Sequence, residues 1–576
     1  MRGSLLSRFS LHYFRTKNTR KRELVEEFAA WGICTRYDSM MQISTAVGNE
    51  AIDQFVKEKL VCPTEMKKDV FTTGALDNID HNPTSNRAKG SFHGTAMSLT
   101  NHISYETSGT IRDYQKEEGV FLKKFLEDLP EEYTVVPHVD MDCESVMPST
   151  NITEHEYVSA DNTNQRHENW AYNIKELLEK DEDSISKANV SWSAYFADAQ
   201  ETVKRPPAIS ALFPMFREKA ATVPMIKHGM DVIQKSTLFL NPKQDATIIA
   251  MDQPLFSLAK KLQWECPDMY GEDKFVIMMG GLHIEMVILQ ILGQWLEDSG
   301  WSKIMKDAKV STEGRVNALE KGSSTARGQW AHQVTFAALV ILKHRAYESY
   351  EHTSRSENSP PMPITLWCQM NSEKHPLFYY WTVTSKLERI FLNFMFSQRN
   401  GDFLLYVDTI GEVIPWAYKY NYVHYARWLS VHAHDLNNLP KVSRKTFEEF
   451  LKGNFVTQKS THKFSFLALD QIHEQLNKTV KGVGGVVGIT EDESSLKRWM
   501  VTGPKVSSML TDFQSKLNEK KHSTTRHHEQ IPSIQMSFAN DVRNTIAAFE
   551  VYGNPFMDNS EDLYALDTKK ILDSEC

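Results

Sequence analysis

The stretch Ala246-Thr247-Ile248-Ile249-Ala250-Met251-Asp252-Gln253-Pro254 decides the fold class that the sequence predicts. It is a short apolar run that ends at an acid, and residues 254–264 after it have the apolar spacing of a helix. A continuous apolar run of this length is typical of a strand that is covered on both faces, as in sheets flanked by helices. We therefore expect an α/β protein with a buried sheet and with Asp252 at the end of a strand.

Similar runs elsewhere in the chain predict the rest of this sheet. The expected order is strand, strand, strand, helix, strand, helix, strand, which is the order of a ribonuclease H-like core with a mixed sheet flanked by helices. The strands are expected at residues 69–76, 91–100, 133–139, 246–251 and 274–279, and the helices at 225–240, 254–264 and 284–296.

The last helix of the predicted core is expected far downstream of the other core elements. Residues 301–455 are helical in character throughout, and a helix that carries acids and a suitable polar face comes only at residues 464–479. The expected organisation is a helical N-terminal region (1–66), a first part of the core (67–300, with a mobile loop at 140–165), a large all-helical insertion (301–455), the final core helix (456–504) and a polar tail with one amphipathic helix (505–576).

Three acids stand where these predicted elements could bring them together. Asp77 follows one strand, Asp252 follows another, and Glu474 lies on the late helix. Adjacent strands place residues that are far apart in sequence side by side, and carboxylate oxygens are the ligands that Mg²⁺ prefers. We expect Asp77, Asp252 and Glu474 to bind two Mg²⁺ or Mn²⁺ ions, which would stabilise the attacking and leaving oxygens in phosphodiester cleavage.

Two further residues are candidates for the same site. Asp80 competes with Asp77 for the role of first ligand, and the sequence leaves this choice open. His283 follows Gly280-Gly281 at the mouth of a strand, where it could bond the scissile phosphate or a carboxylate; a structural or helix-capping histidine is the alternative. For a strand-end aspartate such as Asp252, the alternative is a helix cap.

The composition limits the other classes of protein. The 576 residues contain no apolar run long enough to span a membrane, and the N-terminus lacks a secretory signal, so we expect a nuclear or cytoplasmic protein that is neither secreted nor membrane-bound. The six cysteines contain no Cys-x-x-Cys pair, which excludes a zinc finger of the usual spacing. The formal net charge of −9 argues against a wholly basic DNA-binding surface, which leaves local patches at residues 15–22 and 516–528.

Long motifs across residues 60–510 resemble an uncharacterised, transposon-derived family of animal proteins. The layout is similar to hAT-type and related DDE transposases, which also interrupt a ribonuclease H-like core with a helical domain. This resemblance assigns metal-binding roles to Asp77, Asp252 and Glu474, although the zinc-binding DNA-recognition module usual in such transposases is missing here. The motifs are Val70–Pro83, Ser91–Thr95, Ile226–Asp231, Met251–Phe256, Met278–Met286, His424–Leu429 and Asp470–Gln475.

The sequence thus predicts a transposase-like protein that cleaves or transfers DNA strands with Mg²⁺ or Mn²⁺. Two alternatives stay open: a catalytically inactive descendant that serves as a DNA- or protein-binding scaffold, and a metal-dependent nuclease that acts on RNA.

Overall fold

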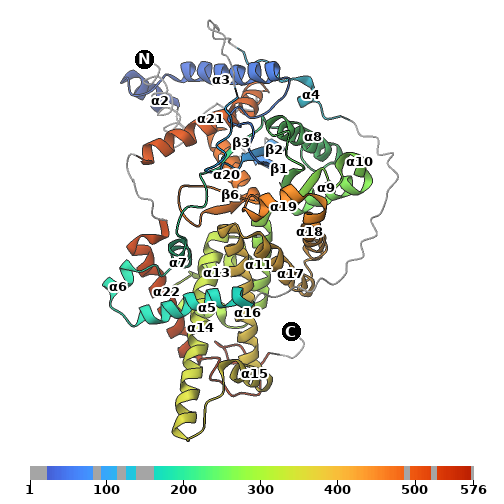
Figure 1. Ribbon diagram of the computed structural model, residues 1–576. Helices are drawn as coiled ribbons and strands as arrows, with labels where there is room; N and C mark the ends of the chain where they lie inside the picture. Colours follow the sequence, from blue (N-terminus) through green and yellow to red (C-terminus); the bar gives the residue numbers. More distant parts are fainter. Residues whose placement is uncertain are drawn as a thin grey trace.

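The structure is a computed structural model that describes residues 22–81, 92–112, 125–137, 161–484, 493–519 and 528–572. It is a mixed α/β protein with a five-stranded sheet in its upper half and a large group of helices below it (Figure 1). In this part of the chain, no helix is both long enough and apolar enough to cross a membrane.

The sheet has the strand order β3-β2-β1-β4-β5. Its first three strands are antiparallel, whereas β4 runs parallel to β1 and β5 runs parallel to β4. The apolar runs of β4 and β5 are buried along their whole length, as the sequence predicts for central strands between two layers of helices. The strands are β1 (Thr72–His81), β2 (Phe92–Asn101), β3 (Ile209–Leu212), β4 (Thr247–Met251) and β5 (Phe275–Met279).

Helices cover both faces of this sheet. On one face α8 (Val223–Leu240) approaches β1 so closely that a Cβ on Gly229 would lie 2.3 Å from the Leu76 side chain. Next to α8 are α9 (Gln253–Glu265) and the short α10 (Pro267–Tyr270). On the other face α20 (Leu469–Gly484) contacts the sheet through a 2.8 Å hydrogen bond between Ser98 and His473. Beyond α20 lie α21 (Glu493–Glu519) and the N-terminal helices α2 (Arg22–Ala30) and α3 (Tyr37–Glu58).

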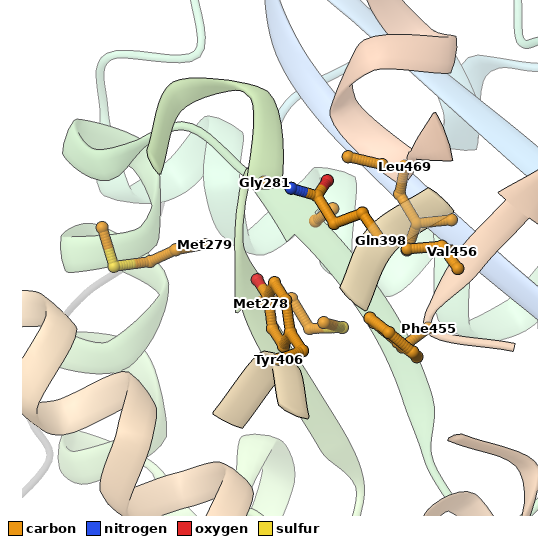
Figure 2. Close-up of a pocket in the computed structure, with 10 residues that line it drawn as sticks. Met278, Met279, Gly281, Gln398, Tyr406, Phe455, Val456 and Leu469 are labelled. Atoms are coloured by element: carbon orange, nitrogen blue, oxygen red, sulfur yellow. The ribbon is translucent and has the colours of Figure 1, made fainter. Parts of the chain in front are cut away.

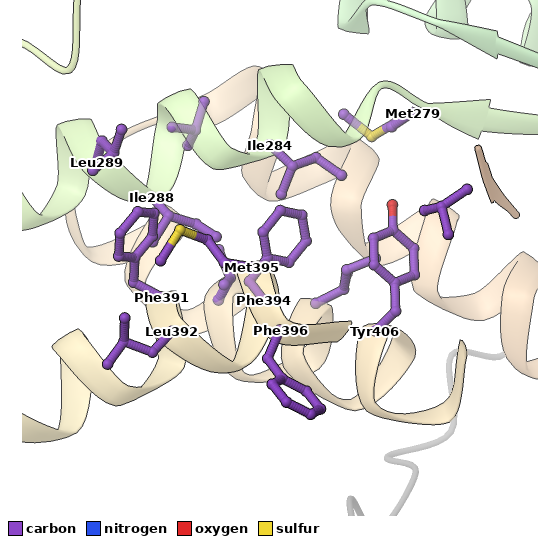
Figure 3. Packing of buried hydrophobic residues seen from close by; sticks show 14 of the residues in the cluster. Met279, Ile284, Ile288, Leu289, Phe391, Leu392, Phe394, Met395, Phe396 and Tyr406 are labelled. Carbon is purple, nitrogen blue, oxygen red and sulfur yellow. The ribbon is translucent and has the colours of Figure 1, made fainter. Parts of the chain in front are cut away.

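The helical half is built around α11 (Gly281–Trp295) and α16 (Pro376–Asn400). Ile284 and Ile288 of α11 pack against Phe391 and Met395 of α16 (Figure 3). Every element from residue 301 to 451 is a helix: α12 (Trp301–Asp307), α13 (Glu313–Glu320), α14 (Thr325–Ser356), α15 (Ile364–Lys374), α16, α17 (Phe403–Lys419), α18 (Val423–Val442) and α19 (Arg444–Leu451).

Other segments complete this half of the molecule. Helix α14 packs against α5 (Asp161–Leu178) and α22 (Pro532–Tyr552), which come from before and after the 301–451 region. A hairpin of β6 (Val456–Gln458) and β7 (Phe466–Ala468) leads into α20. The remaining elements are α4 (Glu131–Thr134), α6 (Glu182–Lys187), α7 (Trp192–Ala199) and a 3-10 turn at His528–Gln530.

Several details differ from the sequence-based expectation. Residues 466–468 of the helix expected at 464–479 form strand β7, and α20 begins only at Leu469. Strand β1 continues past Asp77 to His81 because it stays paired with β2 as far as Phe92. The third strand is residues 209–212, and no strand forms in the described part (133–137) of the one expected at 133–139, where Tyr133 belongs to α4. Residues 161–165 of the expected mobile loop begin helix α5. Helix α21 continues across the boundary expected at residue 504.

Some expectations fall on residues that the structure does not describe. The loop residues 140–160 and the basic residues 15–21 lie outside the described ranges, as do residues 520–527 of the second basic patch. Residues 516–519 of that patch belong to α21.

A buried lysine joins the helical region to the sheet layer. Lys260 of α9 is 1% exposed, and its Nζ lies 2.9 Å from Asp435 of α18 and 3.0 Å from Glu272. Gln263 accepts a third hydrogen bond from this amine at 2.8 Å. A buried charge is tolerated only when it is paired and hydrogen-bonded, so this network requires all of its partners.

We predict that Lys260→Ala lowers the free energy of unfolding by about 3–5 kcal/mol, because it leaves the buried Asp435 without its cation. The neighbouring Lys261→Ala removes only an exposed pair with Glu265 and should cost less than about 1 kcal/mol. Urea unfolding of both variants measures the difference. Equal stabilities of the two variants would contradict this reading of the network.

Candidate carboxylate site

Two of the predicted acids lie side by side at one edge of the sheet. In the parallel pairing of β1 with β4, Leu76 is opposite Met251, so the next residues, Asp77 and Asp252, follow at the same level. Asp77 Oδ1 accepts a hydrogen bond from the Asn78 N–H at 2.6 Å, and Asp252 Oδ1 accepts one from the Leu255 N–H at 3.2 Å. Asp252 is therefore the N-cap of α9 as well as a strand-end acid.

Helix α20 brings Glu474 to the same place. Burial and, after it, the negative charges of Asp252 and Glu474 together raise the pKa of Asp77 to about 8. Burial also raises the pKa of Asp252, and the negative charges of Asp470 and Glu474 add to this rise. The three predicted ligands thus lie within electrostatic range of one another, although about 400 residues separate the first from the last.

A fourth acid, Asp470, holds α20 against the N-terminus of α11. Its Oδ2 accepts hydrogen bonds from the Leu282 N–H (3.0 Å), the His283 N–H (3.3 Å) and His283 Nδ1 (3.0 Å). The residue at the N-cap of α11 is Gly280, which has no side chain to bond these N–H groups. Asp470 therefore caps a helix from a distant part of the chain, where the positive end of the helix dipole favours a carboxylate.

The glycine at this cap is required by space. A Cβ on Gly280 would lie 2.3 Å from Asp470 Oδ2, which is shorter than any real contact of that kind. On the following residue, a Cβ on Gly281 would lie 2.7 Å from Gln398 Oε1. The Gly-Gly pair before His283 thus permits the close approach of two side chains from the helical half and from α20.

His283 lies in the field of all these acids. Burial alone would lower its pKa, but the hydrogen bond to Asp470 and the charges of Asp470, Asp77 and Asp252 raise the pKa to about 9. The imidazole is therefore protonated near neutral pH and places one positive charge among the carboxylates.

Asp80 does not share this position. It is three residues beyond Asp77 on β1, and alternate residues of a strand point to opposite faces of the sheet. Its carboxylate is 67% exposed and pairs with the His93 imidazole on β2. Of the two candidates for the first position, the structure places Asp77, and not Asp80, beside Asp252 and Glu474.

A small cavity lies next to the Asp470 cap. It has a volume of about 10 Å³, which is room for one water molecule, and it is lined by residues such as Gly281, Gln398, Tyr406 and Leu469 (Figure 2). This cavity is too small for a substrate. Tyr425 of α18 also reaches this neighbourhood: burial raises the pKa of its hydroxyl above the usual range, and the charges of Asp252 and Asp470 add to this effect.

The acids match a hard divalent cation in chemistry but not in their present arrangement. Every donor that they offer is a carboxylate oxygen, the type that Mg²⁺ and Mn²⁺ prefer. In the described residues, however, no three His, Cys, Asp or Glu side chains stand close enough together to form a ready metal site. Whenever all three are ionised, the like charges of Asp77, Asp252 and Glu474 repel one another, and this repulsion opposes a tighter cluster when no cation is bound.

Sequence reasoning did not identify Asp470 and Gly280 as residues of the site. Both have a signal in the sequence: Asp470 precedes Glu474 by four residues and so shares its helix face, and Gly280 opens the Gly-Gly pair before His283. The sequence does not reveal that Asp470 caps the helix that begins after Gly280. The Leu282 N–H that donates to Asp470 lies 188 residues before it in the chain.

Comparison with known proteins gives one match. The model of a family described as a domain of unknown function (DUF8702) matches residues 191–360 and 363–576, which include Asp252, His283, Asp470 and Glu474 but not Asp77. No curated protein and no solved structure matches the chain.

We predict that Gly280→Ala destabilises the protein by about 1–3 kcal/mol, because the new methyl group displaces Asp470 from the α11 cap. The matched control is Gly314→Ala on helix α13, where an added Cβ meets no atom within 4 Å and the change should be neutral or slightly stabilising. Urea unfolding tests both variants. A neutral Gly280→Ala would show that the cap tolerates the methyl group.

We predict that Asp77→Asn stabilises the metal-free protein by on the order of 1–3 kcal/mol at pH 8, because it removes a carboxyl group that is costly to ionise when buried beside two other acids. The folded-state pKa of Asp77, about 8, lies above its unfolded value of 3.8. The native state therefore binds more protons than the unfolded state, and its stability falls as pH rises through this window. Unfolding of both proteins at pH 5 and pH 8 measures this loss. An equal loss of stability in wild type and variant would contradict the prediction.

Proposed function

The chain belongs to this family of unknown function, and we propose that its carboxylate site performs metal-dependent cleavage or transfer of DNA strands, in the manner of a transposase. The observation that carries this proposal is the meeting of Asp77, Asp252 and Glu474. A strongly raised carboxyl pKa that arises from burial plus specific like charges is typical of a functional site, because such repulsion costs stability without structural benefit.

The topology of the sheet supports the proposal. An antiparallel β1-β2-β3 meander followed by the parallel strands β4 and β5 is the order expected of a ribonuclease H-like core. The helices of residues 301–451 then separate β5 and α11 from the acidic helix α20, as in transposases that interrupt this core with a helical domain. This support is an analogy at the level of the fold, and the site itself carries the functional argument.

Each residue of the site has a defined part in the proposal. Asp77, Asp252 and Glu474 would hold Mg²⁺ or Mn²⁺. When bound, such ions would lower the pKa of a coordinated water or DNA 3′-hydroxyl and would stabilise the attacking and leaving oxygens of the phosphodiester. Asp470 orients the N-terminus of α11 and the imidazole of His283. Protonated His283 would attract the phosphate of the substrate, which is otherwise repelled by three carboxylates.

The absence of a ready three-ligand group in the described residues favours a second candidate. In that case the chain would be an inactive descendant that keeps the fold as a DNA- or protein-binding scaffold. The two candidates differ in one property, because only an enzyme loses its activity when a single carboxylate is neutralised.

We predict that wild-type protein nicks labelled plasmid DNA with Mn²⁺ or Mg²⁺ and that Asp252→Asn reduces the rate at least 100-fold. Asparagine is chosen because it still accepts the Leu255 N–H bond that caps α9, so the variant should fold. The readout is the conversion of supercoiled to open-circle DNA, with a labelled RNA duplex in parallel.

The matched control is Asp181→Asn, which makes the same change at the N-cap of α6, an exposed position outside the site. It should nick like wild type. Metal-dependent nicking that survives Asp252→Asn would refute the assigned role of this site, and cleavage of RNA alone would refute DNA as the substrate.

A further inference from the structure

We propose that five basic residues at the junction of the sheet and the helical half form a binding surface for the phosphate backbone of DNA. This basic cluster consists of Lys204, Arg205, Arg399, Lys459 and Lys463. The residues come from the segment after α7, the end of α16 and the β6–β7 turn. The inference rests on the proposed function, since it names the surface that would hold the substrate of that site.

Acidic neighbours reach the cluster only from a distance: Asp402 lies in electrostatic range of Lys204, and Glu449 lies in range of Arg205. In the ranges that the structure describes, no ion pair joins any of its five side chains to a carboxylate within 4.0 Å. The nearby acids are engaged elsewhere: Glu449 pairs with Lys452 at 2.6 Å, and Asp402 caps α17 through the Leu405 N–H at 3.2 Å. In a chain with nine more acidic than basic residues, such a local excess of positive charge is unusual.

Backbone carbonyls hold several of these cations in place. Lys204 Nζ donates to the Asn400 carbonyl at 2.6 Å, Lys463 Nζ donates to the Gln200 carbonyl, and Arg205 donates to the Lys452 carbonyl. Carbonyls satisfy hydrogen bonds but do not neutralise charge. The cations are thus fixed near one another while their charges stay available to an anion.

The cations also repel one another. Burial lowers the pKa of Lys204; the charge of Asp402 opposes this shift, and the charge of Arg205 adds to it. Burial and the charge of Arg399 lower the pKa of Lys459. Such repulsion destabilises the free protein, and a bound polyanion would relieve it.

The cluster is connected to the carboxylate site. Arg399 lies in the electrostatic range of Glu285 on α11, and Glu285 is in turn in the range of Asp470. The residue before Arg399, Gln398, lines the small cavity together with Gly281 and Leu469 (Figure 2). Since Glu285 and Gln398 are both buried, the cluster and the carboxylate site are coupled through the protein interior.

A DNA backbone fits this arrangement because its charges repeat along the chain. Lys204 and Lys459 are exposed and Arg399 and Lys463 are half-buried, so these four offer cations from several segments and not one enclosed anion pocket. Arg205 is only 7% exposed and adds its charge from beneath them. Each lysine or arginine that neutralises a phosphate releases counterions, which makes the affinity strongly dependent on salt.

The test measures, by fluorescence anisotropy, the binding of the full chain to a labelled duplex of about 30 base pairs. EDTA is present, and the salt concentration is varied over roughly 50–200 mM, where phosphate contacts make affinity strongly salt-dependent. Lys204→Gln/Lys459→Gln should weaken binding on the order of tenfold and reduce the slope of log K against log salt by about 2. Lys204→Arg/Lys459→Arg should bind like wild type, because it keeps both charges.

The matched control is Lys180→Gln/Lys187→Gln, which removes two exposed lysines near α6 and should leave binding unchanged. The inference is overturned if the Lys204→Gln/Lys459→Gln variant binds with wild-type affinity and slope, or if wild type binds duplex RNA but not DNA. Because EDTA prevents cleavage, binding that depends on the cluster supports this inference even if nicking fails. Conversely, if the protein nicks DNA but its DNA binding does not depend on the cluster, this inference is overturned and the proposed function stands.

Discussion

The Asp470 carboxylate at the N-terminus of α11 is the contact on which the arrangement of the site depends. Asp470 lies on α20, which also carries Glu474, and it bonds the start of α11 directly after strand β5. The same carboxylate accepts a hydrogen bond from the imidazole of His283. Without it, α11 would begin with unpaired N–H groups in a buried place. The space for this carboxylate exists only because residue 280 is glycine.

The same contact explains how a chain can separate its acids so widely and still gather them. The sheet register places Asp77 beside Asp252 through β1 and β4. After β5 the chain leaves the sheet through α11, forms the helices of residues 301–451, and returns through the β6–β7 hairpin to α20. Because α11 and α20 meet at the Asp470 cap, this long excursion starts and ends at the same edge of the sheet.

Much of this architecture could be predicted from the sequence, for identifiable reasons. The strands at 247–251 and 275–279 are continuous apolar runs followed by helix signals, and these are strong local patterns. Strand 209–212 has only four residues, so its pattern is too short to distinguish from a loop. The choice of Asp77 over Asp80 depends on which face of β1 each residue occupies, and the Asp470 cap depends on a contact across 188 residues. Neither is encoded in a local pattern.

We propose that Asp77, Asp252 and Glu474 form a cation site in which burial and mutual repulsion keep Asp77 protonated until a cation binds. Calorimetric titration of the full chain with Mn²⁺ at pH 7, in two buffers of different ionisation enthalpy, tests it most directly. Since the pKa of Asp77 is about 8, binding should displace a proton, and the measured heat should differ between the buffers. No saturable Mn²⁺ binding, or binding of equal strength to a chain with Asn at position 77, would contradict the account.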